Sequence, residues 1–151
     1  MENMRYEIKM TAGALKLDVL RVWIRLHAEG FTQAYPGRRV NSIYFDTLDA
    51  HCLQDNLNGV GERTKLRFRW YGEERSRVRG QLELKQRANQ LIRKQVLPLD
   101  IDLDLAEGSW GDIMRTLRQC APEPFATRLA LYGQPLLIVS YWRQYYESAD
   151  H

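Results

Sequence analysis

The sequence predicts a one-domain α+β protein in which an antiparallel β-sheet dominates and helices flank it. Three observations support this fold class. The chain has 151 residues, which suits one domain with a single core. At least five segments alternate charged or polar residues with apolar ones, as strands with two different faces do. Two other segments carry apolar residues at helical spacing.

The first part of the chain is expected to contain two strands and one helix. Residues 5–10 alternate charged with apolar side chains and are expected to form a strand with a charged face. Residues 14–30 have apolar positions at helical spacing. A turn signal at 35–39 precedes a strand at 40–47 of high β-propensity. Residues 48–61 are expected to form a short helical or irregular link.

Three strands are expected in the middle of the chain. Residues 65–72 alternate three cations with Leu, Phe and Trp. A polar connection at 72–80 leads to a second alternating strand at 81–87, and residues 91–99 form a third. The middle of the chain is therefore predicted to be a set of neighbouring antiparallel strands.

The last third is expected to hold one helix and one strand. Residues 100–108 are acidic and are expected to be solvated. A helix is predicted at 109–120 because it starts with a Ser-x-x-Asp capping pattern. The proline-containing segment 121–124 ends that helix, and 136–148 form a long last strand.

Composition favours a soluble protein whose basic character is local. The formal net charge is only +3, too small for a non-specific nucleic-acid coat. Cys52 and Cys120 are far apart in the sequence, which argues against a disulfide framework or a zinc site and suits a reduced compartment. The N-terminus has no apolar signal region, and no apolar run approaches the length of a membrane span. A cytoplasmic protein without direct membrane insertion is expected.

The cations that line the charged strand faces need counter-charge. Like charges along one strand face repel each other, and burying them requires counter-charge. If the faces converge in a barrel or groove, a bound polyanion such as a chain of phosphates supplies that counter-charge. Carboxylates among the cations are then candidate ligands for Mg²⁺ or Mn²⁺. The cations are Arg5, Lys9, Lys65, Arg67, Arg69, Lys85, Arg87, Arg93 and Arg143, and the carboxylates are Glu7, Asp46 and Glu83.

Six segments, taken in order, resemble the VTC domain, the polyphosphate polymerase domain of vacuolar transporter chaperone proteins and their bacterial relatives. The segments are RYEIKM, NSIYFDT, RTKLRFRWYG, LELK, IRKQV and SYWRQYY. The resemblance covers nearly the whole of residues 1–151, and KLRFRWYG together with LELK is its most specific part. The family belongs to the triphosphate tunnel metalloenzymes, also called the CYTH-like group.

The resemblance implies a closed antiparallel β-tunnel lined by basic residues. It also implies transfer of the terminal phosphoryl group of a nucleoside triphosphate to a polyphosphate chain, aided by a divalent cation. In the family pattern, Lys65, Arg67, Arg69, Lys85 and Arg143 are expected to act in catalysis. The same residues are expected to bind phosphate together with Lys9, Arg93 and Lys94. Glu83 and Glu7 are the expected metal ligands, and Asp46 is expected to orient a metal or a cation.

Two departures from the family pattern affect these expectations. Gln95 stands where the family commonly has a second cation. Family members also continue with an Arg-x-Thr-x-Asp strand and a late strand bearing a metal-binding Glu and a Lys, whereas this chain stops at His151. The resemblance therefore implies a fragment, a tunnel completed by a second chain, or a non-catalytic relative, and an isolated chain that polymerises phosphate poorly.

Three alternatives to polymerisation remain open from the sequence. A domain of this kind can bind triphosphate or polyphosphate without turnover, or it can hydrolyse triphosphate. A third alternative is binding of single-stranded nucleic acid by stacking on Trp70, Tyr71, Trp142 and Tyr145. It ranks low because the aromatic residues alternate with the cations, so core packing on the other sheet face is the simpler explanation.

Overall fold

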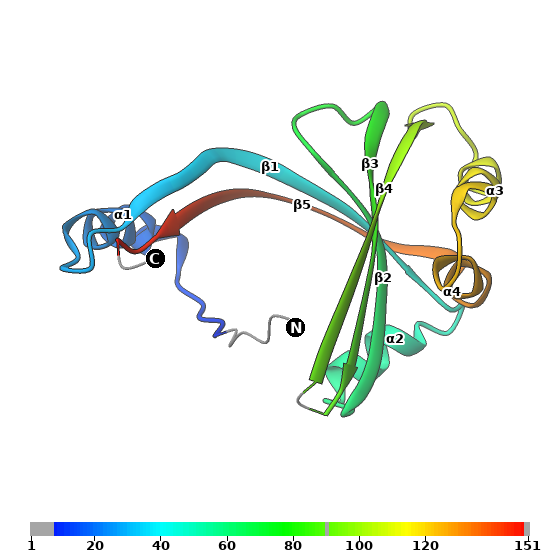
Figure 1. The fold of residues 1–151 in the computed structure, drawn as a ribbon, viewed down its shortest axis with the longest axis horizontal. Coiled ribbons are helices and arrows are strands. Elements are labelled where there is room, and N and C mark those ends of the chain that lie inside the picture. The colour runs from blue at the N-terminus through cyan, green and yellow to red at the C-terminus, as the bar shows by residue number, and fades with distance from the viewer. Residues whose placement is uncertain (1–7, 90, 150–151) are drawn as a thin grey trace. The chain divides into compact units, whose positions relative to one another are not determined.

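The computed structural model of the protein describes residues 8–89 and 91–149. The fold is α+β, with one five-stranded antiparallel sheet and four α-helices, as the sequence predicts for the class (Figure 1). The strand order is β4-β3-β2-β1-β5. The strands are β1 (Thr32–Asp46), β2 (Glu62–Tyr71), β3 (Arg77–Ala88), β4 (Leu91–Asp104) and β5 (Gln134–Glu147). The α-helices are α1 (Leu17–Leu26), α2 (His51–Leu57), α3 (Trp110–Cys120) and α4 (Phe125–Leu131), with a 3-10 turn at Ala14–Lys16.

The chain divides into two compact units. One unit contains residues 39–142, and the other contains residues 1–38 together with 143–151. The first holds β2, β3, β4 and helices α2, α3 and α4, while the second holds α1.

The hydrophobic core of the 39–142 unit lies between the apolar face of the sheet and helices α3 and α4. Leu66, Phe68 and Trp70 of β2 alternate with the cations and are buried, Leu66 and Phe68 completely. They pack with apolar residues of β3, β4, α3 and α4, and Figure 1 shows the two helices together beside the strands. Because Trp70 lies in this core, it is not available to stack on a base. The other core members are Ile43, Phe45, Val78, Leu82, Leu84, Leu99, Leu103, Ile113, Met114, Leu117, Ala121, Phe125 and Leu129.

Local signals explain the two helices that cover the core. The side-chain oxygen of Ser109 accepts a hydrogen bond from the backbone N–H of Asp112 at 3.1 Å, so the predicted cap of α3 is confirmed. The short helix α4 was not predicted. It buries Phe125 and Leu129, which are four residues apart on one helix face. That spacing was its sequence signal, but seven residues are too few for a periodic pattern to stand out.

Three segments differ in secondary structure from the prediction. Residues 8–10 form no strand, and the rest of the 5–10 prediction lies outside the described residues. Residues 35–39, which were predicted to form a turn, are part of β1. The pairing of β1 with β2 begins only at Val40, so the missing backbone N–H of Pro36 does not interrupt that pairing. The acidic segment predicted as solvated continues β4 to Asp104: Leu99 and Leu103 are buried while the aspartates between them face outward.

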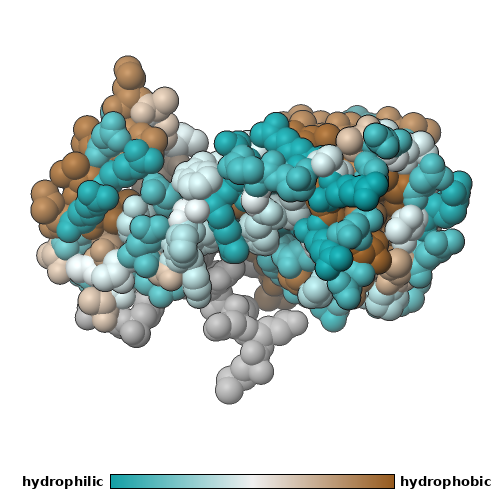
Figure 2. All heavy atoms as spheres, turned by 90° about the horizontal axis from the view of Figure 1, so that it is seen from above, coloured by the Kyte–Doolittle hydropathy of each residue, from teal (hydrophilic) through white to brown (hydrophobic). Residues whose placement is uncertain are grey.

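The 1–38 and 143–151 unit exposes much of its apolar surface. No residue of α1 is buried, and Val19, Val22 and Leu26 are more than half exposed. Figure 2 shows hydrophobic residues gathered on this part of the surface. The helix is confirmed but is shorter than the predicted 14–30 span. No helix among the described residues has the length and apolar character needed to cross a membrane.

Candidate anion-binding site

Cationic side chains gather on one face of β2, β3 and β4, opposite the hydrophobic core. The register pairs Lys65 with Lys85, Arg67 with Glu83, and Arg69 with Gln81. Directly paired residues on antiparallel strands point to the same face, so alternation carries the whole set to one side. We call this set the charged face: Arg63, Lys65, Arg67, Arg69, Gln81, Glu83, Lys85, Arg87 and Lys94.

Three lysines form a row across the charged face. Lys65 of β2 is paired with Lys85 of β3, and Lys85 is paired with Lys94 of β4. Side chains in such positions have Cβ atoms about 5 Å apart, and like charges there repel each other. A bound anion that contacts all three ammonium groups would relieve this repulsion.

The neighbouring row is organised around the carboxylate of Glu83. Arg67 Nε donates a hydrogen bond to Glu83 Oε2 at 2.8 Å, and Gln81 Nε2 donates to Glu83 Oε1 at 2.8 Å. Arg69 Nη1 lies 3.5 Å and Lys94 Nζ 3.4 Å from the same Oε1 atom. One carboxylate thus receives donors from three adjacent strands, and we call this arrangement the Glu83 cluster. Part of the counter-charge for the cations therefore comes from within the protein.

The Glu83 carboxylate is charged although it is buried. Its side chain is 2% exposed. Burial acts to raise the pKa of Glu83, but the hydrogen bond and charge of Arg67, with the charge of Arg69, outweigh burial and lower it. Arg67 responds in the opposite sense: burial alone would lower its pKa, and the bond and charge of Glu83 raise it. The Glu83 carboxylate and the Arg67 guanidinium are therefore both charged.

Strand β1, the neighbour of β2 on the side away from β3, also holds Arg67 and Arg69. Arg67 Nη1 donates to the hydroxyl of Tyr44 at 2.8 Å, and Arg69 Nε donates to Ser42 Oγ at 3.3 Å. Both partners follow from the β1–β2 register, which sets Tyr44 opposite Arg67 and Ser42 opposite Arg69. The guanidinium groups are thus fixed between neighbouring strands, which limits their rotamers before any ligand arrives.

The side chains of the charged face differ in how much of them solvent reaches. Arg69 is 8% exposed and Arg67 is 21% exposed, whereas Lys94 is 43% exposed. Lys65 and Lys85 are partly exposed. An anion that approaches from solvent therefore meets the lysines more readily than the inner arginine.

The other predicted site residues lie elsewhere. Arg93 is paired with Gln86 and so points to the face opposite Lys94. Lys9 is exposed and, like Arg143, belongs to the unit that contains α1. In that unit the guanidinium of Arg143 lies 4.7 Å from the centre of the Tyr145 ring. Glu7 lies outside the described residues.

Asp46 caps a helix rather than joining the Glu83 cluster. One carboxylate oxygen of Asp46 accepts the backbone N–H of Cys52 at 2.9 Å, and the other accepts that of Leu53 at 3.0 Å. Both donors lie in the first turn of α2, whose N–H groups have no partners within the helix. Residues 48–61 were expected to form a short helical or irregular link, so no defined helix start pointed to this role of Asp46.

The described residues do not assemble a metal site by themselves. Within them, no group of three or more His, Cys, Asp or Glu side chains could hold a metal ion. Glu83 is surrounded by Arg67, Arg69 and Lys94, which repel a cation. A divalent metal at the charged face would therefore need ligands from a phosphate chain.

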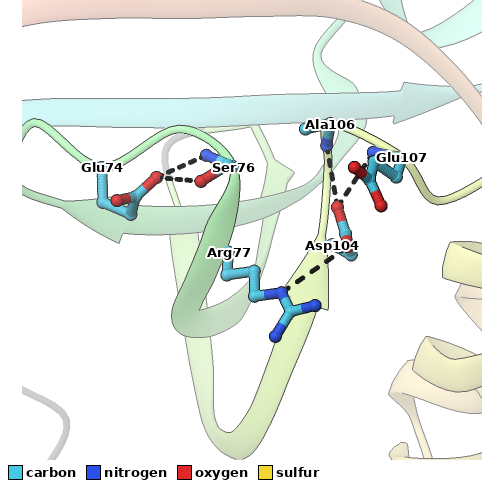
Figure 3. Close-up of a pocket in the computed structure, with 6 residues that line it drawn as sticks. All are labelled: Glu74, Ser76, Arg77, Asp104, Ala106 and Glu107. Carbon is cyan, nitrogen blue, oxygen red and sulfur yellow. Dashed lines mark hydrogen bonds and ion pairs between the residues drawn. The ribbon is translucent and has the colours of Figure 1, made fainter.

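A pocket of about 360 Å³ lies apart from the charged face, between the β2–β3 loop and the end of β4 (Figure 3). Two of its three carboxylates, those of Glu74 and Asp104, are already engaged in hydrogen bonds. Glu74 accepts from the backbone N–H groups of Arg75 and Ser76, and Asp104 accepts from those of Ala106 and Glu107. The hydroxyl of Ser76, followed by the backbone N–H groups of Ser76 and Arg75, lowers the pKa of Glu74 to about 2. The pocket is best explained as two turns held by their acidic residues.

Comparison with known families agrees with the geometry. The family profile of the VTC domain matches residues 4–151, nearly the whole chain. No curated protein sequence matches the chain significantly. The chain therefore belongs to the VTC domain family.

Proposed function

We propose that the charged face binds the phosphates of a nucleoside triphosphate or of polyphosphate. The observation that carries this proposal is the row Lys65–Lys85–Lys94 beside the ordered guanidinium groups of Arg67 and Arg69. Three ammonium groups on adjacent strands can each contact a different phosphate of a linear chain. Arginines beside them add planar, multi-donor contacts to phosphate oxygens.

Membership of the VTC family supports transfer of a terminal phosphoryl group to a polyphosphate chain as the reaction. The protein need not supply a nucleophile, because phosphoryl transfer depends mainly on positioning and on neutralising the charge of the phosphoryl oxygens. Lys65 and Lys85 would hold the phosphates, and Arg67 would donate to a phosphoryl oxygen with the N–H groups that Glu83 and Tyr44 leave unused. Arg69 is almost enclosed and would act mainly through its charge.

A closed tunnel is part of the same proposal. In the described residues the sheet is ordered from β4 at one edge to β5 at the other. Further strands that paired with these edges, from the same or a second chain, would enclose the charged face and exclude water. Exclusion of water strengthens every contact between a cation and a phosphate. Lys9 and Arg143, in the other unit, stay predicted phosphate ligands, whereas Arg93 points to the opposite face of the sheet.

A divalent metal, Mn²⁺ or Mg²⁺, would enter as a complex with the triphosphate. Phosphate oxygens and water are its usual ligands, completed by one or two carboxylates. A metal bound in this way would neutralise charge on the triphosphate oxygens. Glu7 remains a proposed ligand, whereas Glu83 would first have to leave its cationic partners.

Binding without turnover is the second candidate function. It is favoured by the lack of a carboxylate cluster among residues 8–89 and 91–149. Chain-length analysis of products from ATP, Mn²⁺ and a short polyphosphate primer separates the candidates. Elongated primer supports the polymerase, released phosphate without elongation supports a triphosphatase, and unchanged primer with tight binding supports the binding domain.

The binding step is tested by calorimetry with tripolyphosphate in the presence of EDTA. We expect wild type to bind tripolyphosphate more tightly than single-stranded DNA of equal charge, because the lysine row suits consecutive phosphates. Lys85→Met should weaken tripolyphosphate binding about tenfold or more, the effect of losing one charged hydrogen bond. Arg115→Met is the matched control, since Arg115 is an exposed cation of α3 paired with Asp112. Equal losses in both variants, or equal affinity for DNA, would contradict the proposal.

A further inference from the structure

We propose that Glu83 is a positioning residue, an internal counter-ion that presets the guanidinium of Arg67 for phosphate, rather than a metal ligand. The inference rests on the proposed function of the charged face. It assigns a role to the one side chain of that face whose charge opposes anion binding.

The contacts of Glu83 explain why its charge is kept. Its Oε2 atom receives Arg67 Nε, and its Oε1 atom receives Gln81 Nε2. Arg69 and Lys94 approach Oε1 at 3.5 and 3.4 Å. Both carboxylate oxygens are therefore engaged by protein donors, and the side chain is 2% exposed. A metal would have to displace at least one of these cations.

The same contacts fix the direction of Arg67. Its Nε and Nη2 both donate to Glu83 Oε2 and its Nη1 donates to Tyr44, so all three of its nitrogens are held by neighbouring strands, and one N–H remains on each of Nη1 and Nη2. A guanidinium carries five N–H donors in a rigid plane, so this clamp leaves donors whose direction is already set. Preset donors lose less rotamer entropy when they bind phosphate than free side chains do.

Two explanations of Glu83 predict opposite signs for one substitution. If Glu83 acts only through its charge, Glu83→Gln removes a repulsion and tripolyphosphate binds more tightly. If Glu83 positions Arg67, the same change weakens binding. The amide NH₂ of glutamine would face Arg69, Gln81 and Lys94, which are all donors, so the clamp would rearrange.

The experiment measures tripolyphosphate affinity by calorimetry, in EDTA and again with Mn²⁺, for wild type and Glu83→Gln. We expect Glu83→Gln to weaken binding about tenfold in EDTA, of the order of one charged hydrogen bond. Tighter binding in EDTA would overturn the inference. A loss confined to the Mn²⁺ series would also overturn it and would assign Glu83 to the metal. Unchanged affinity of the folded variant would show that Glu83 has a merely structural role.

A second readout does not depend on the ligand. Side-chain NMR of the free protein follows hydrogen exchange of Arg67 Nε–H, which should be slow in wild type and at least several-fold faster in Glu83→Gln. Equal exchange rates would contradict the clamp. If wild type does not bind tripolyphosphate at all, the proposed function fails, while this exchange measurement still decides whether Glu83 holds Arg67.

A milder variant covers the case in which Glu83→Gln does not fold. Gln81→Met removes the bond to Glu83 Oε1 without changing any charge. Positioning predicts a loss of tripolyphosphate affinity of about twofold to fivefold, smaller than for Glu83→Gln, because Glu83 keeps its bonds to Arg67 and the change reaches the guanidinium only indirectly. A simple charge effect predicts no change, so unchanged affinity would count against the inference.

Discussion

The two faces of β2 show how one strand meets two physical demands. Leu66, Phe68 and Trp70 are covered by the core and need only shape complementarity. Lys65, Arg67 and Arg69 need counter-charge, and the protein supplies part of it as a single buried carboxylate, Glu83. The apolar face therefore determines stability, whereas the charged face balances stability against the capacity to bind anions.

The largest expected effect comes from the apolar face. Phe68 is fully buried, so Phe68→Ala should lower the free energy of unfolding by about 3–5 kcal/mol through lost burial and a cavity. Urea denaturation followed by fluorescence measures the loss. Because Phe68 points away from the charged face, the folded fraction should keep its affinity for tripolyphosphate. A large loss of affinity in that fraction would show that the two faces are not independent.

The next effect comes from the charged face. Arg67→Ala removes a donor to phosphate and the main partner of Glu83, so tripolyphosphate binding should weaken by roughly 1.5–3 kcal/mol. Calorimetry on the folded variant measures it. Arg115→Met again serves as the control. If Arg67→Ala binds like wild type, the ordered guanidinium is not part of the anion site.

A pH series tests whether Glu83 is ionised in the fold. Its pKa lies below the ordinary value of 4.5, so its ionised state stabilises the fold above that pH, and the contribution is lost as pH falls through the folded pKa. Exposed carboxylates with lowered pKa values, such as Glu74 and Asp102, add to the same trend. The difference in unfolding free energy between wild type and Glu83→Gln isolates Glu83. That difference should shrink as pH falls below 4.5, and a constant difference would contradict the ionised cluster.

The smallest effect is expected at an exposed ion pair. Arg79 Nε lies 2.6 Å from Asp102 Oδ1, and both side chains are more than half exposed. Solvent screening makes such pairs weak, so Arg79→Met should leave the urea midpoint within experimental error of wild type. A clear drop would mean that charge pairs on this sheet stabilise the protein even outside the Glu83 cluster.

The sequence predicted which face of the sheet each side chain lies on better than it predicted which residues are paired across neighbouring strands. Period-two alternation in TKLRFRWY separated the core residues from the cations, and the order of elements followed from similar patterns. The register could not be obtained in the same way. It places Glu83 opposite Arg67 and Arg93 opposite Gln86, and it depends on the turns and on packing between segments distant in sequence.

The roles of individual polar residues were the least predictable. Tyr44, Ser42 and Gln81 belong to no recognisable sequence motif. They acquire a role only because the strand register brings Tyr44 and Ser42 to the arginines and Gln81 to Glu83. Predicting them would have required the β1–β2–β3 register in advance. Asp46 matched the pattern of a site residue but caps α2, because a carboxylate at the end of a strand can also satisfy the N–H groups of a following helix.

The most direct test of the charged face uses the five lysines of the chain as probes. Protein labelled with ¹³C-lysine is titrated with tripolyphosphate, and the Hε–Cε signals are assigned by single Lys→Arg variants. We predict saturable shifts at Lys65, Lys85 and Lys94 with one common dissociation constant, and no saturable shift at Lys16, which is exposed in the α1 unit. Saturable shifts at Lys16 alone, or none at the three lysines of the row, would contradict the charged face as the phosphate site.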